Sequence, residues 1–404
     1  MRLLYFFFFL MLILPTMYQP IRGVLLLILC LAGLNMKYGR IDSMIRSFLV
    51  LNLIACFFNW IYSLIVGNPG ALANVSIFLI WPALYFFLMM KCKSMDIVFG
   101  LYKVIVYGGL IVLAENVIFI GNNFFLNSTI IESLGELLGF RYGIYDGFIE
   151  YFSPSQSYLP YFFYFSCSML LVPHGRIEVE NKWLIVMAVT SAIMILISGR
   201  RAMWLTIGVL PIYLMIILKI CKLQSFSILK ILSLCVVIVG VLFYALVNFF
   251  DLEYMTLELL STFDMESNES NLERVLQNKS LLNDFWNSPI IGQGIGFVSS
   301  YVRTPDHPWE YELVYQYLLA SFGLLGMLVL CMPFVWVLKT SIDIVKKTGK
   351  YAELIIPAIS GSFVFLLINA TNPYLLKFDF LWIFFLPIIV LNQIRININR
   401  QPLQ

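Results

Sequence analysis

The chain has 404 residues, of which 61% are hydrophobic and only 12% are charged. Roughly a quarter of the residues in a soluble domain carry charge, so this composition excludes a water-soluble globular protein and indicates an all-α polytopic membrane protein. The formal net charge of +3 gives no reason to expect a nucleic-acid partner.

The first apolar run covers Leu3–Leu14 and follows Met1-Arg2. A signal peptide would end at small residues suited to cleavage, whereas this run meets Pro15. We therefore expect a retained first transmembrane span.

About twelve apolar segments follow one another along the chain, and the shorter ones would need tilt or re-entry to cross a bilayer. They lie near residues 3–18, 23–36, 47–66, 71–90, 97–120, 157–173, 183–198, 202–220, 228–250, 313–338, 354–370 and 378–392. The predicted organisation is nine spans within 1–250, a large periplasmic loop over 251–312, and three spans with a tail over 313–404.

Lysine and arginine collect in alternate loops, such as those with Lys37 and Arg46 or Lys346 and Lys350. The positive-inside rule places these basic loops in the cytoplasm. Both termini are then cytoplasmic, as an even number of spans requires.

Two substantial segments lie on the opposite, periplasmic side, from about 121 to 156 and from about 251 to 312. The larger one is acidic and has three basic residues, Arg274, Lys279 and Arg303. Apolar side chains recur in it at helical spacing, at Leu272, Val275, Leu276, Leu282 and Trp286. Although Lys279 interrupts this stripe, it predicts an amphipathic helix that lies on the membrane or on the bundle.

The first candidate site is the pair Arg200-Arg201, which stands between the apolar runs Trp183–Ile197 and Ala202–Leu205. The two arginines occupy the tight connection of a predicted helical hairpin, on the side where the positive-inside rule disfavours them. Arginine at membrane depth is costly and marks a functional candidate, such as an anion site. Simple snorkelling of the long side chains to water is the alternative.

The second candidate joins Arg274 to Trp286 and to the run Pro289–Phe297, which contains Gly-Gln-Gly-Ile-Gly. A dinucleotide-binding fingerprint would need a preceding strand and a third glycine where Phe297 stands, so we reject that interpretation. Glycine there can let the backbone approach a ligand or a neighbouring helix, or can simply form a turn.

The third candidate is the stretch Asp306–Glu312 at the mouth of a span, where His307 and Glu312 could form an acid/base pair. An ordinary polar loop with an interfacial belt of Trp309, Tyr311 and Tyr315 explains the same residues. The seven cysteines show no CxxC or Cys/His spacing, so we expect no metal site and no cofactor.

Together the three candidates resemble the Wzy-type O-antigen polymerases and O-antigen ligases, a superfamily of polytopic membrane glycosyltransferases. The resemblance covers roughly residues 183–330. It rests on Arg201-Ala202-Met203-Trp204, on Arg274 with Trp286 and Pro289–Gly296, and on a polar residue eleven positions before Gly323-Leu324-Leu325-Gly326, which is Glu312. Histidine is expected at that last position in the ligase branch, so Glu312 favours the polymerase branch.

The resemblance implies glycosyl transfer from an undecaprenyl-diphosphate-linked glycan, without a metal, at the periplasmic face of the bacterial inner membrane. It implies Glu312 or His307 as the catalytic base. The implied diphosphate ligands are Arg201 and Arg274, helped by Arg200 or Arg303, and the implied substrate-binding residues are Tyr311, Trp309 and Arg141.

Membrane lipid is the implied surrounding, and a chain-length regulator and a flippase are the implied protein partners. Two alternatives stay open. One is a ligase that transfers O-antigen to the lipid A core of lipopolysaccharide. The other is a lipid-linked oligosaccharide flippase, for which Glu115 and Asn116 within a span are the main features. The sequence does not separate O-antigen from capsule or exopolysaccharide systems.

Overall fold

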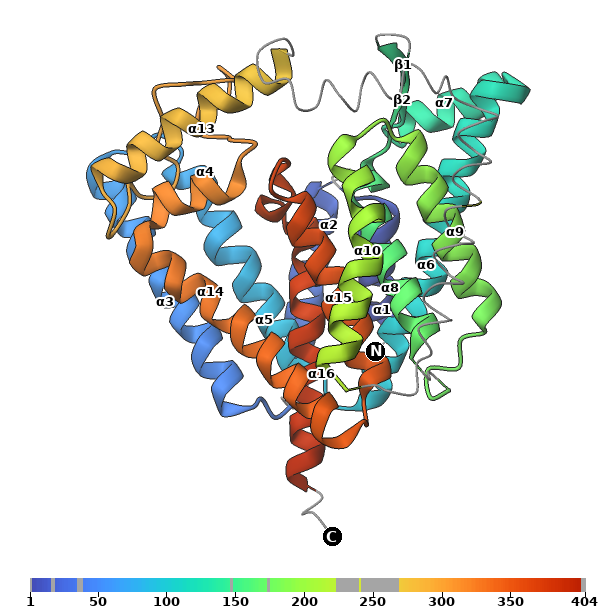
Figure 1. The fold of residues 1–404 in the computed structure, drawn as a ribbon. Helices are drawn as coiled ribbons and strands as arrows, with labels where there is room; N and C mark the ends of the chain where they lie inside the picture. Colours follow the sequence, from blue (N-terminus) through green and yellow to red (C-terminus); the bar gives the residue numbers. More distant parts are fainter. Residues whose placement is uncertain are drawn as a thin grey trace.

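A computed structural model describes residues 2–15, 19–34, 39–145, 148–172, 175–222, 240 and 269–400 (Figure 1). The first half contains α1 (Arg2–Ile13), α2 (Gln19–Leu34), α3 (Ser43–Val66), α4 (Ala71–Val75), the π-helix η1 (Ser76–Ile80), α5 (Trp81–Lys91) and α6 (Met95–Gly121). The π-helix η2 (Asn122–Leu126), α7 (Thr129–Leu137), the antiparallel strands β1 (Arg141–Tyr145) and β2 (Phe148–Phe152), and the 3₁₀-helix η3 (Pro154–Tyr158) follow.

The remaining elements begin with α8 (Leu159–Leu171), α9 (Asn181–Ile197) and α10 (Arg201–Ile220). After a gap come α13 (Glu269–Asn287), α14 (Val314–Thr348), α15 (Ala352–Ile368), the 3₁₀-helices η4 (Pro373–Leu376) and η5 (Phe378–Phe380), and α16 (Leu381–Arg400). The predicted span at 228–250 lies outside the described residues, apart from residue 240. Every other predicted span coincides with helix, and the predicted all-α class holds except for the short β1–β2 hairpin.

Six of the described helical segments are long and apolar enough to cross a membrane. They are Ser43–Val66, Ala71–Lys91, Met95–Gly121, Ala202–Ile220, Val314–Thr348 and Phe378–Asn399. The rest of the protein buries only 11% of the most apolar part of α3, and Ile65 on that helix is 79% exposed. Apolar surface of this extent is not stable in water, so these helices define a multi-pass membrane protein. A total of twelve spans stays a prediction.

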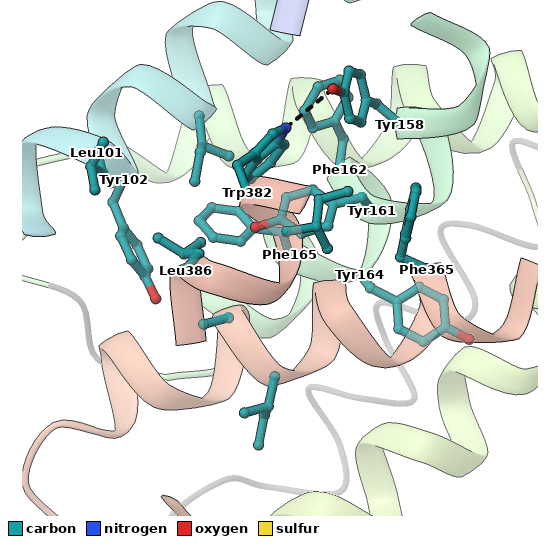
Figure 2. Packing of buried hydrophobic residues seen from close by; sticks show 14 of the residues in the cluster. Leu101, Tyr102, Tyr158, Tyr161, Phe162, Tyr164, Phe165, Phe365, Trp382 and Leu386 are labelled. Atoms are coloured by element: carbon teal, nitrogen blue, oxygen red, sulfur yellow. Dashed lines mark hydrogen bonds between the residues drawn. The ribbon is translucent and has the colours of Figure 1, made fainter. Parts of the chain in front are cut away.

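The main hydrophobic core gathers around α8, α15 and α16 (Figure 2). Trp382 of α16 is fully buried, and its indole N–H donates a hydrogen bond to the Tyr158 hydroxyl at 3.1 Å. Tyr161 meets the Trp382 ring edge to face, with 5.0 Å between the ring centroids. Buried tryptophan and tyrosine need such polar partners, so this contact fixes η3 and α8 against α16.

A second, smaller hydrophobic cluster lies at one end of the molecule and is built from α3, α13, α14 and the loop between α13 and α14. In Figure 1, α3 runs beside α14 and α13 crosses above them. The same end of the molecule carries α7 and the β1–β2 hairpin, and the C-terminus lies at the opposite end. Leu375 of η4 packs against both clusters, so the connection between α15 and α16 lies where they meet.

The backbone of the glycine-rich run Pro289–Phe297 is hydrogen-bonded to α14 within the second cluster. α14 is interrupted at Gly323, whose φ of 61° and ψ of −172° are not helical. Gln293 N donates to Ala320 O at 2.8 Å, and Leu324 N donates to Pro289 O at 2.8 Å. A Cβ atom at Gly323 would overlap Ile290 O. These glycines therefore permit close approach to a neighbouring helix, which is one of the roles that the sequence predicts.

The predicted amphipathic helix exists as α13, and most of its predicted apolar stripe faces outward rather than onto the bundle. Leu281, which lies off that stripe, is fully buried, whereas Trp286 on it is 71% exposed. Leu272, Val275 and Leu276 are exposed as well. Because Gln277 and Ser280 on the inner face bind the following loop, polar residues replace apolar ones there and the apolar pattern points outward.

Candidate functional site

The predicted hairpin around Arg200 is confirmed. α9 ends at Ile197, Gly199 turns the chain with φ 66°, and α10 begins at Arg201. Ser198 Oγ accepts a hydrogen bond from Arg200 N at 3.3 Å, and the Trp204 indole donates to Ile195 O at 3.1 Å. These two hydrogen bonds hold the turn in place. The Arg201 side chain lies outside the described part of the structure, and its role stays a prediction.

Arg200 points toward the connection between α15 and α16. Its Nη1 donates to the Tyr374 hydroxyl at 3.0 Å, and its guanidinium lies 5.5 Å from the centroid of the Phe152 ring. Its Nε is buried and has no hydrogen-bond partner among the described residues. An unbonded guanidinium N–H in a buried position is costly, so Arg200 is well suited to an additional acceptor.

Four charged residues form an arginine–glutamate cluster between α13 and the loop that follows it. Arg274 Nε lies 3.2 Å from Glu312 Oε2, and Arg303 also pairs with Glu312. Arg303 Nε in turn lies 2.8 Å from Glu273 Oε2. Each of these side chains is about one-third exposed, so the cluster is open to a ligand. Two cations and two carboxylates balance, which leaves the ligand-free cluster without net charge.

Gln277 holds Glu312 in register with Arg274. The buried Gln277 Oε1 accepts hydrogen bonds from Glu312 N at 3.1 Å and from Leu313 N at 3.0 Å. Gln277 follows Arg274 by one turn of α13, so one rigid helix fixes both the arginine and the backbone of its carboxylate partner.

Electrostatic coupling joins Arg200 to the arginine–glutamate cluster through the connection between α15 and α16. Burial raises the pKa of Tyr374, the positive charge of Arg200 opposes this shift, and the negative charge of Glu312 adds to it. Burial lowers the pKa of Lys377, Asp379 and Glu310 oppose that shift, and Arg200 adds to it. Tyr374 therefore lies within electrostatic range of Arg200 and Glu312, and Lys377 within range of Arg200.

The other residues predicted for the site are placed less favourably. Exposed His307 lies edge-on to Trp309, with 6.0 Å between the rings, and Trp309 packs on Gly70. Exposed Arg141 stands at the start of β1. Among the described residues, no hydrogen bond or ion pair joins the side chains of His307 or Arg141 to Glu312.

Tyr311, which the resemblance implies as a substrate-binding residue, is buried. Its ring stacks on Phe297 and Tyr317, and its hydroxyl binds Ser299 N at 2.6 Å and Phe297 O at 3.2 Å. The Phe297 and Tyr317 rings hold Tyr311 in the second cluster.

Gln277, Tyr374 and Lys377 are not among the residues that the sequence predicts for the site. Tyr374 and Lys377 follow α15, far from the motifs, and only tertiary packing brings them to Arg200. The available signal was Lys377 itself, a lysine on the side that the positive-inside rule depletes of basic residues. Nothing in the pattern of α13 distinguishes Gln277 from a surface residue.

This region combines guanidinium and ammonium groups with a carboxylate, a set of groups that can bind an anion. Guanidinium and ammonium groups bind phosphate through charge-assisted hydrogen bonds. In the part of the chain that the structure describes, no three His, Cys, Asp or Glu side chains gather in a way that could hold a metal ion.

These observations define the class as a multi-pass membrane protein with a charged site at one end of its helix bundle. Residues 186–331 match a family model described as O-antigen ligase. The match begins in α9, ends in α14, and includes Arg200, Arg274, Arg303 and Glu312. It supports the superfamily to which the motifs point and does not distinguish polymerase from ligase. Searches of curated proteins and of solved structures gave no match.

Proposed function

We propose that the chain polymerises undecaprenyl-diphosphate-linked oligosaccharide repeat units of a surface polysaccharide at the periplasmic face of the bacterial inner membrane. One observation carries the proposal: Glu312, selected by its spacing from Gly323-Leu324-Leu325-Gly326, contacts Arg274 and Arg303 from separate segments. The match of residues 186–331 to the O-antigen ligase family supports an enzyme that handles lipid-linked glycans.

The proposed reaction breaks the bond between the anomeric carbon of the donor sugar and its diphosphate. A hydroxyl at the non-reducing end of a newly delivered unit attacks that carbon, and undecaprenyl diphosphate leaves with the electron pair. The attack comes from the opposite face and inverts the anomeric centre. Arginines neutralise the departing diphosphate in place of a metal ion, and a carboxylate takes the proton of the attacking hydroxyl.

Glu312 is our first choice as this base and His307 the second. In the ligand-free cluster Glu312 is bound by Arg274 and Arg303. A diphosphate would compete for these guanidinium groups and release the carboxylate beside the acceptor hydroxyl. Arg201 and Arg274 are the proposed main diphosphate ligands, with Arg200 and Arg303 assisting.

The test is an assay of the purified protein with undecaprenyl-diphosphate-linked repeat units, with analysis of the products by length. We expect polymer ladders from wild type and from the control Asp306→Asn, which changes an exposed carboxylate of the same loop. Arg201→Ala, Arg274→Ala and Glu312→Gln should lose about 10²- to 10⁴-fold in rate. EDTA should leave the wild-type rate unchanged. Normal ladders from both arginine variants would overturn the mechanism.

A ligase that delivers the glycan to the lipid A core is the second candidate, because the matching family model is described as O-antigen ligase. A deletion strain separates the two. Loss of long polymer with retention of lipopolysaccharide capped by a single repeat would support the polymerase. Loss of every capped species would support the ligase.

The proposal includes the predicted arrangement of the chain in the membrane. Residues 1–250 and 313–404 would hold the spans, residues 251–312 would be periplasmic, and both termini would be cytoplasmic. A flippase that delivers repeat units and a chain-length regulator would be its partners.

A further inference from the structure

The connection between α15 and α16 brings a second cation to Arg200. Lys377 is partly buried, and its ammonium makes no hydrogen bond or ion pair with any described residue. The positive charge of Arg200 adds to the lowering of the Lys377 pKa, so the two cations lie within electrostatic range of each other. The hydroxyl of Tyr374 lies beside this pair, bonded to Arg200 at 3.0 Å.

Asp379 and Glu310 lie within electrostatic range of Lys377, but neither forms an ion pair with it. Asp379 forms an ion pair with Arg22, and both of these side chains are buried. Glu310 is exposed and forms no ion pair with Lys377. Arg274 and Arg303 differ from Lys377 and Arg200 in this respect, because they form ion pairs with Glu312 and Glu273. Among the described residues, the cations of the arginine–glutamate cluster are thus paired with carboxylates, whereas Lys377 and Arg200 form no ion pair.

We propose that Lys377, Arg200 and the Tyr374 hydroxyl form an anion subsite that binds the phosphates of a prenyl diphosphate. This inference rests on the proposed function and adds Lys377 and Tyr374 to the ligands of the donor diphosphate. The lysine supplies a point charge, the free Arg200 Nε–H supplies a donor, and Tyr374 supplies a hydroxyl. Arg201 and Arg274 then bind the same diphosphate, and Glu312 is left to face the acceptor hydroxyl.

The subsite carries a cost in folding free energy. Two partly buried cations that form no ion pair with a described residue, one of them with an unbonded N–H, lower the stability of the folded protein. An anion that bridges them removes the repulsion and supplies the missing acceptor. Preorganised binding sites keep such destabilising charges because binding of the ligand offsets the loss of stability.

The experiment measures binding of farnesyl diphosphate to the purified full-length protein in phosphatidylcholine nanodiscs. We expect Lys377→Met to raise the dissociation constant by about 10- to 100-fold, the usual effect of losing a charge-assisted hydrogen bond to phosphate. The dissociation constant of Lys377→Arg should remain within about threefold of the wild-type value because arginine keeps the positive charge. Lys279→Ala, which removes an exposed lysine of α13, should bind as wild type does.

Thermal unfolding of the ligand-free protein provides a second readout. A purely structural lysine would lower the unfolding temperature when replaced. Removal of an unpaired cation should leave it unchanged or raise it, so Lys377→Met should combine normal or higher stability with weaker binding. A drop in stability without a change in binding would overturn the subsite.

Comparison of ligands identifies the anion. Inorganic pyrophosphate should bind with the same dependence on Lys377 as farnesyl diphosphate. If Lys377→Met weakened the binding of phosphatidylglycerol but not of either diphosphate, the residues would form a lipid-headgroup site and the inference would be overturned. Wild type that binds farnesyl diphosphate through Lys377 but makes no polymer would refute the proposed function and keep the subsite. Normal polymerisation and donor KM in Lys377→Met would refute the subsite and keep the function.

Discussion

Glu312 illustrates how single residues of this site depend on their neighbours. Its carboxylate is shared by Arg274 and Arg303, while its backbone N–H is bound by Gln277. The side chain is thus held by charge, and the main chain is held by a neutral amide. A catalytic base needs both kinds of restraint, because a small displacement of the base from the acceptor hydroxyl lowers the reaction rate strongly.

Gln277 is therefore predicted to be a positioning residue. Gln277→Leu leaves the buried N–H groups of Glu312 and Leu313 without an acceptor, which costs about 1–3 kcal/mol for each group. We expect the turnover number to fall by at least about tenfold with little change in donor KM, measured as initial rates of polymerisation. Gln277→Glu keeps an acceptor oxygen and should recover most of the turnover. Equal losses in both variants would contradict the positioning role.

The depressed pKa of Lys377 predicts the pH dependence of donor binding. Only the ammonium form binds an anion, and burial lowers the Lys377 pKa below the ordinary 10.5, so this form is lost at a lower pH than for an exposed lysine. Affinity for farnesyl diphosphate should fall as the pH rises through the shifted pKa. Lys377→Arg should extend tight binding to higher pH because arginine stays charged. Superimposable binding profiles of the two proteins would argue against Lys377 as the titrating ligand.

Individual helices were predictable from sequence because lipid and core both demand continuous apolar runs. The runs at 47–66 and 202–220 correspond to α3 and α10 within a few residues. The inner face of α13 was not predictable, because Gln277 and Ser280 are buried through hydrogen bonds to a loop. Periodicity detects apolar burial and is blind to polar residues that satisfy a neighbour's backbone.

The break in α14 at Gly323 is a second feature that helical periodicity conceals, and it yields a stability prediction. Gly323→Ala places a Cβ in a backbone conformation that only glycine adopts readily, and in overlap with Ile290 O. We expect a loss of at least about 1–3 kcal/mol in the free energy of unfolding, measured by denaturation in detergent. Gly208→Ala in α10 is the matched control. Apart from the backbone of its own helix, no described atom lies within 4 Å of the place that the new Cβ would take, so this variant should be neutral or stabilising by up to about 1 kcal/mol.

On the scale of the whole molecule, the site lies where two hydrophobic clusters meet. Arg200 belongs to the hairpin that packs in the main core, and Glu312 belongs to the smaller cluster with α13 and α14. Tyr374 precedes Leu375, which touches both clusters, and it responds electrostatically to both residues. The sequence indicated each half separately through its motifs. It could not indicate the connection between α15 and α16 that completes the site, because no local pattern relates residues so far apart.

The orientation of this end of the molecule is the remaining prediction on that scale. We propose single-cysteine variants, in a background without the natural cysteines, at exposed Val302 beside the site and at exposed Lys347 near the end of α14. A membrane-impermeant maleimide added to intact spheroplasts should label Val302→Cys at once and Lys347→Cys only after permeabilisation. The opposite pattern would put Glu312 in the cytoplasm, where a polymerase of flipped lipid-linked units could not meet its substrate. The labelling thus tests the charge asymmetry of the loops and the proposed site of reaction together.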